Sequence, residues 1–305
     1  MILLAFGRLA LQAVPILYIV SLIVFGLVFL AGDPTVMMVP ETATEEDRLA
    51  LVAAWGLDQP VYVQYLRYMG NVLQGNFGTS YSYGTSALPI VLDRVPATLL
   101  LTGAALLVAI VIAVPGGIIA ALRRNSAIDH AVSGVAVLGK SMPSFWVGIM
   151  LILIFGVNLR LLPVSGSGTV AHLVLPAITL GISFSADLIK LVRTSMLETL
   201  GQDYIRTAYS KGIPDWLVIV KHAFRNAAIP TLTMTSLHIV ALLGGALVTE
   251  TVFAWPGLGQ LIVQAVYNKD MAVIQIAVFA ITIMTLLVNF VTDILYRLID
   301  PRILL

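Results

Sequence analysis

Six long, sparsely charged stretches of apolar residues constrain the fold of this chain more than any other feature. A helix needs about 20 residues to cross a hydrocarbon core of about 30 Å, because it rises 1.5 Å per residue. Only 11% of the residues are charged and 59% are hydrophobic, whereas soluble proteins have about 25% charged residues. The sequence therefore predicts an all-α polytopic membrane protein, a single domain over residues 1–305. The expected spans are residues 9–31, 97–122, 131–157, 173–192, 227–248 and 271–295.

Charge is distributed unevenly among the connections. Residues 32–96 contain seven acidic and three basic side chains, whereas residues 193–226 contain five basic ones and the short connection after the second span carries Arg123 and Arg124. Lys and Arg are enriched in cytoplasmic loops. Both termini and the two basic connections are therefore predicted to be cytoplasmic, with residues 32–96 forming an external segment. The net charge of +1 points to no nucleic-acid partner, and a chain without cysteine has no disulfide or thiolate site.

The external segment is expected to contain two short amphipathic helices. Residues 45–57 have helical apolar spacing after an acidic start, and residues 60–75 show a second such pattern. We expect these helices to lie on the membrane face or to pack on the bundle.

The connection between the fourth and fifth spans, residues 193–226, is basic and has helical spacing. Its sequence predicts two short helices interrupted at Gly212-Ile213-Pro214, because glycine favours a helix end and proline a new start. A basic amphipathic pair of this kind binds either the lipid surface or a soluble partner.

Residues 134–141, GVAVLGKS, match the phosphate-loop pattern G-x-x-x-x-G-K-[ST]. That loop works between a strand and a helix, but here the match lies inside an apolar span with no strand before it. We therefore predict no nucleotide site.

Lys140 then lies about 14 Å inside the cytoplasmic end of its span, where a charge is costly. Either it pairs with Asp187 of the fourth span, or it extends alone to the interface.

The 4–5 connection resembles the cytoplasmic EAA-type loop of ABC-importer permeases. Arg206, Thr207 and Ala208 occupy the E-A-A positions, Gly212 is the loop glycine, and Ile229-Pro230 is the closing pair. Further matching stretches follow in the expected order along nearly the whole chain, and together they resemble the B-type subunit of dipeptide/oligopeptide permeases. They include FLAGDP, RVPATLLLT, SMPSFWVGIML, LRLLPVSGSG, ETVFAWPGLGQLIVQAV and LYRLIDPRI.

The resemblance implies a type I ABC importer permease of the bacterial cytoplasmic membrane, without catalytic activity of its own. The implied partners are a homologous second permease, two cytoplasmic ABC ATPases that bind ATP and Mg²⁺, and an external solute-binding protein. No cofactor or metal is expected on this chain. The implied cargo is a short peptide, with nickel, glutathione, opines or oligosaccharides as alternatives. The residues expected to couple the chain to an ATPase are Tyr204, Arg206, Thr207, Ala208, Lys211, Gly212, Ile213 and Pro214.

Two further residues are candidates for the translocation pathway or its gate, besides Lys140 and Asp187. Glu250 resembles the glutamate of an E-x-V-F-x-x-P-G-x-G element and either gates the outer side, contacts the binding protein or caps the following turn. His238 either lines the pathway or makes an interhelical hydrogen bond. The other classes to consider are a self-contained secondary transporter, for which we find no inverted repeat, and a membrane enzyme, for which we find no catalytic cluster.

Overall fold

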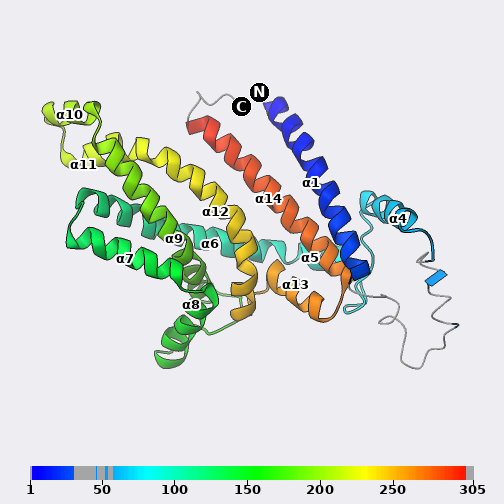
Figure 1. Cartoon of the computed structure of the whole chain (residues 1–305). Coiled ribbons are helices and arrows are strands. Elements are labelled where there is room, and N and C mark those ends of the chain that lie inside the picture. The colour runs from blue at the N-terminus through cyan, green and yellow to red at the C-terminus, as the bar shows by residue number, and fades with distance from the viewer. Residues whose placement is uncertain (1, 31–45, 47–51, 54–57, 300–305) are drawn as a thin grey trace. The chain divides into compact units, whose positions relative to one another are not determined.

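Figure 1 shows the computed structural model, which describes residues 2–30, 46, 52–53 and 58–299. Every regular element in these ranges is helical, and Thr79 and Ser86 form an isolated bridge. This confirms the all-α class. The elements are α1 (Ile2–Leu30), α4 (Val61–Leu73), α5 (Ala87–Leu92), α6 (Val95–Leu122), α7 (Ala127–Ser141), α8 (Ser144–Leu151), the π-helix η1 (Ile152–Asn158), α9 (Val170–Leu200), α10 (Asp203–Ser210), α11 (Asp215–Leu217), the π-helix η2 (Val218–Phe224), α12 (Arg225–Val252), α13 (Leu258–Tyr267) and α14 (Met271–Ile299).

Three helical segments among the described residues are long and apolar enough to cross a membrane. A fourth is added if the bent pair α7 and α8–η1 counts as one span. Helices α1 and α12 cover the other two expected spans, but several of their side chains lie outside the described set, so six spans stay a prediction. The three segments are Ala87–Leu122, Val170–Leu200 and Met271–Thr292.

The third expected span, residues 131–157, is not one straight helix. Helix α7 ends at Ser141, and α8 begins at Ser144 with a bend of 103° between the two parts. Met142 is extended, with φ −84° and ψ 131°. The reason is local, because the ring of Pro143 disfavours a helical conformation at the residue before it.

The described chain divides into two compact parts, and the first combines Met1–Pro96 with Leu261–Leu286. Within it α4 packs on α1 through aromatic rings, and the hydroxyls of Tyr65 and Ser21 are 2.7 Å apart. Burial raises the pKa of the neighbouring Tyr68. The carboxylate of Asp270, just before α14, accepts a hydrogen bond from Ser80 in the turn region. Helix α4 confirms the second expected amphipathic helix, whereas most of the first, residues 45–57, lies outside the described residues.

The second part combines Ala97–Gln260 with Leu287–Leu305, and glycines bring α6 and α9 close together in it. A methyl group added at Gly117 of α6 would lie 2.6 Å from Cβ of Val192, and one at Gly181 of α9 would lie 2.6 Å from Cγ1 of Val108. Small residues permit this approach of helix backbones inside a membrane. The second part contains the 4–5 connection and all four candidate pathway residues.

Candidate functional site

The 4–5 connection is built on an extension of α9. This helix continues beyond the expected end of the fourth span, residue 192, as far as Leu200, and α10 begins at Asp203 after a short turn. In Figure 1, α10 and α11 lie beyond the ends of α9 and α12. The predicted interruption is confirmed, because α10 ends at Ser210 and α11 begins at Asp215.

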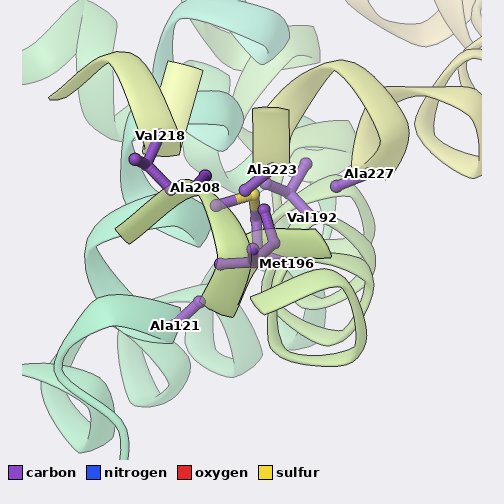
Figure 2. Packing of buried hydrophobic residues seen from close by; sticks show 8 residues of the cluster. Ala121, Val192, Met196, Ala208, Val218, Ala223 and Ala227 are labelled. Carbon is purple, nitrogen blue, oxygen red and sulfur yellow. The ribbon is translucent and has the colours of Figure 1, made fainter. Parts of the chain in front are cut away.

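One face of α10 is buried against the chain's own hydrophobic core. Ile205 is 1% exposed and Ala208 is 6% exposed. Figure 2 shows Met196 of α9 at the centre of this cluster, surrounded by side chains from α6, α9, η2, α12 and α10. The buried members of the cluster are Ala121, Val192, Met196, Ile205, Ala208, Val218, Ala223 and Ala227.

The opposite face of α10 is exposed and carries polar and aromatic side chains. The Arg206 side chain is 79% exposed, and Thr207 and Lys211 are also exposed. The hydroxyl of Tyr204 accepts a hydrogen bond of 2.8 Å from Nδ2 of Asn226, which fixes α10 to the start of α12. The predicted coupling residues therefore divide, because Ala208 points inward while Arg206, Thr207 and Lys211 point outward.

Gly212 has a φ of +71°, and no atom lies within 4 Å of a methyl group added there. Space is therefore available for a side chain at this position. What the turn requires is a left-handed backbone, which glycine adopts at no steric cost. The N–H groups of Gly212 and Ile213 donate to the carbonyls of Tyr209 and Ala208 and close the end of α10.

A bidentate ion pair connects the base of α9 with the first turn of α7. Arg193 Nε and Nη2 donate to the two carboxylate oxygens of Asp129 at 2.6 and 2.7 Å. The Asp129 side chain is 5% exposed, and it also accepts a hydrogen bond from the backbone N–H of Asn125. This pair could not be predicted from the sequence, because its only signal there is an acidic residue near an expected helix start.

The phosphate-loop match lies within α7, where backbone N–H groups are engaged in the helix. Gly134 to Ser141 are helical, so they form no loop that wraps a phosphate.

The structure brings Lys140 and Asp187 together, with Nζ of Lys140 2.5 Å from Oδ1 of Asp187. A methyl group added at Gly139 would lie 3.2 Å from Cγ2 of Ile182, so this level of α7 packs against Ile182 of α9. Asp187 lies roughly one turn farther along α9, and the Lys140 side chain extends in that direction to reach it. That direction agrees with the tilt of side chains toward a helix N-terminus.

His238 of α12 is 9% exposed and packs against α9 near Asp187. Its ring packs edge-on against Phe184 with centroids 5.2 Å apart, and it lies within electrostatic reach of both Lys140 and Asp187. Its Nε2 atom has no hydrogen-bond partner among the described residues. Lys140, Asp187 and His238 thus form one group from α7, α9 and α12.

Glu250 is separate from that group and completely buried, at 0% exposure. Its Oε1 accepts a hydrogen bond from Thr98 at 2.7 Å, and its Oε2 accepts from the backbone N–H groups of Gly259 and Gln260 at 2.7 and 3.1 Å. Thr98 also accepts from the N–H of Leu258. The carboxylate therefore caps the first turn of α13 and ties it to the start of α6. A role in gating stays a prediction.

Comparisons with known proteins cover almost the whole sequence. The model of the family described as "Binding-protein-dependent transport system inner membrane component" matches residues 113–305, and the model of the N-terminal part of such membrane components matches residues 2–102. The oligopeptide transport system permease protein AppB of Bacillus subtilis is 37% identical over 97% of this chain and 98% of its own length. The dipeptide transport system permease protein DppB of Escherichia coli K12 is 38% identical over 93% and 94%.

Solved structures show the same fold. An inward-facing structure of the MetNI methionine ABC transporter matches 69% of this chain and 96% of its own with a TM-score of 0.60, at 19% sequence identity. Because the family model covers more than half of the chain and relatives above 30% identity run along nearly its full length, this protein belongs to the inner membrane components of binding-protein-dependent transport systems.

Proposed function

We propose that this chain is the permease subunit of an ATP-driven importer and forms half of a translocation pathway for short peptides. The observation that carries the coupling role is the division of α10 into two faces. Its inner face is fixed to the ends of α6, α9, η2 and α12, whereas Arg206, Thr207 and Lys211 are exposed and accessible to a partner. A displacement of α10 by that partner is transmitted to several membrane helices at once.

The partner of the exposed face is a cytoplasmic ABC ATPase. Arg206 and Lys211 offer positive charge to acidic groove residues, and the exposed ring of Tyr209 offers an apolar contact, so that closure of two ATPases around ATP changes the orientation of the bundle. The basic 2–3 and 4–5 connections and both termini lie in the cytoplasm on this proposal. ATP and Mg²⁺ are bound by the ATPases and not by this chain, which is consistent with the helical phosphate-loop match.

The similar proteins support peptides as the cargo. Relatives at 37–38% identity are oligopeptide and dipeptide permeases, and the glutathione transport system permease protein GsiC of Escherichia coli O1:K1 is 39% identical over 95% of this chain. A second permease completes the pathway, and an external binding protein delivers the peptide.

Site-directed labelling tests the coupling role, because the chain has no cysteine. We expect Thr207→Cys to react with a maleimide when the two permeases are purified alone, and its labelling rate to fall about tenfold when the ATPases are bound, as burial in an interface requires. Arg124→Cys, exposed on the same expected side but outside α10, is the matched control and should react equally in both preparations.

Equal labelling of Thr207→Cys with and without the ATPases would contradict the coupling role. Reconstitution then tests the cargo, since uptake of dipeptides should require ATP, both ATPases and the binding protein. Uptake by the purified chain alone under an ion gradient would instead identify a self-contained secondary transporter.

A further inference from the structure

The Lys140–Asp187 pair is partly exposed at the surface of the second compact part of the chain. The Lys140 side chain is 56% exposed and that of Asp187 is 28% exposed. Both residues belong to expected membrane spans, where a charge directed at lipid is costly and normally faces a bundle interior or a water-filled path. The open side of this pair is therefore expected to face water or another subunit.

The backbone breaks immediately after Lys140, and this gives independent support. Helix α7 ends at Ser141, Met142 is extended, and Pro143 precedes the next helix. Non-helical backbone at membrane depth is tolerated only where it is enclosed by protein or lines a water-filled cavity. The break in the helix and the exposed charges thus both indicate that this end of α7 faces a water-filled path or another protein surface.

Two buried polar atoms beside the pair have no partner among the described residues. They are Nε2 of His238 and Oγ of Ser183. Ser183 lies four residues before Asp187 on α9, and therefore on the same face of that helix. Because a buried polar atom is costly to leave unpaired, these atoms have hydrogen-bonding capacity left for an enclosed water molecule, or for a solute once the helices around them move apart.

We propose that Lys140, Asp187 and His238 form a contact site for zwitterionic cargo within the pathway. The carboxylate end of a peptide binds the Lys140 ammonium, its amino end binds the Asp187 carboxylate, and His238 hydrogen-bonds to the uncharged main chain. The inference rests on the proposed function and adds to it a reason for the cargo class.

The balance of charge at the site supports this cargo over a metal cation or an uncharged sugar. A zwitterion replaces both partners of the Lys140–Asp187 pair, so neither charge is left unpaired at low dielectric. A metal cation would meet the positive charge of Lys140, and an uncharged sugar would replace neither charge. The site therefore selects a solute with both signs of charge.

Three forms of one dipeptide test the site in the complete transporter with its binding protein, reconstituted in liposomes. They are the free dipeptide, its cationic C-terminal amide and its anionic N-acetyl form. Uptake of each form by a variant is divided by wild-type uptake, so that the preference of the binding protein cancels. Lys140→Gln should raise the ratio for the amide about tenfold relative to the free dipeptide, and Asp187→Asn should do the same for the N-acetyl form, as expected for one charge-assisted hydrogen bond.

The exchanged pair Lys140→Asp/Asp187→Lys should restore the wild-type preference, which separates a charge effect from misfolding. Exposed Lys190, also on α9, provides the matched control, and Lys190→Gln should leave all three ratios unchanged. His238→Phe should lower uptake of all three forms to a similar extent, and full uptake by that variant would exclude the imidazole from the site.

Wild-type uptake with unaltered ratios in both single charge variants would overturn this inference alone. If the wild-type complex imported none of the three forms and the loaded binding protein did not stimulate ATP hydrolysis, the proposed function would fail, and the inference with it.

Discussion

Gly212 is a single residue on which the geometry of the coupling segment depends. Its φ of +71° is strained for any residue with a side chain. We expect Gly212→Val to distort the turn between α10 and α11 and to lower peptide-stimulated ATP hydrolysis by the assembled transporter at least fivefold, whereas Gly212→Asn should be milder because asparagine tolerates left-handed backbone.

Gly201, the residue that ends α9 before the short helix α10, provides the control for Gly212. Gly201 ends α9 with a φ of −78°, and an added methyl group there meets its nearest atom at an ordinary 3.5 Å. Gly201→Ala should therefore keep wild-type activity. If Gly212→Val were as active as Gly201→Ala, the conformation of this turn would have no importance for coupling.

Glu250 shows how one carboxylate organises its surroundings. Glu250→Ala leaves the buried N–H group of Gly259 and the partly buried N–H group of Gln260 without their acceptor, which should lower the free energy of unfolding by about 1–3 kcal/mol. Gly257→Ala should also destabilise the protein, because the new methyl group would lie 2.1 Å from Oε1 of the same carboxylate.

Thermal unfolding in detergent, followed by tryptophan fluorescence, measures both effects. Gly103→Ala in α6 is the control, since no atom lies within 4 Å of its added methyl group. Should Gly257→Ala unfold at the same temperature as Gly103→Ala, the close packing around Glu250 would be refuted.

At the scale of elements, the Arg193–Asp129 pair connects α9 with α7. Arg193→Met removes one partner and leaves the Asp129 carboxylate without its cation, and breaking such a pair on one side is destabilising because the remaining charge has no partner. We expect a clearly lower unfolding temperature, and partial recovery when Asp129→Ser removes the remaining charge in the double variant. The exposed pair Asp203–Arg206, with oxygen and nitrogen 3.8 Å apart, provides the contrast.

Asp203→Asn should change the unfolding temperature little, because exposed pairs contribute about 0–1 kcal/mol. Additive losses from Arg193→Met and Asp129→Ser would show that the two side chains do not stabilise each other.

Element boundaries follow from local sequence far better than contacts between elements do. The apolar stretches and the Gly212–Pro214 signal gave the helices and the interruption of the 4–5 connection, because both depend on neighbouring residues. The break at Pro143 had a signal in the proline itself, but an apolar run on both sides favoured one continuous span. The contact between Thr98 and Glu250 joins residues 152 positions apart, and such a contact depends on how the helices pack, which no local pattern specifies.

At the scale of the whole molecule, the distribution of charge predicts the sidedness of the chain. Tyr81 lies in the external segment and is 42% exposed, whereas Arg124 and Thr207 lie in the basic connections. A membrane-impermeant maleimide should therefore label Tyr81→Cys in intact spheroplasts. It should label Arg124→Cys and Thr207→Cys only after the cytoplasmic membrane has been permeabilised. Ile205→Cys, at a position 1% exposed, should stay unlabelled in both conditions. Labelling of Thr207→Cys from outside in sealed cells would show that the chain has the opposite orientation. Helix α10 would then lie where no cytoplasmic ATPase can reach it.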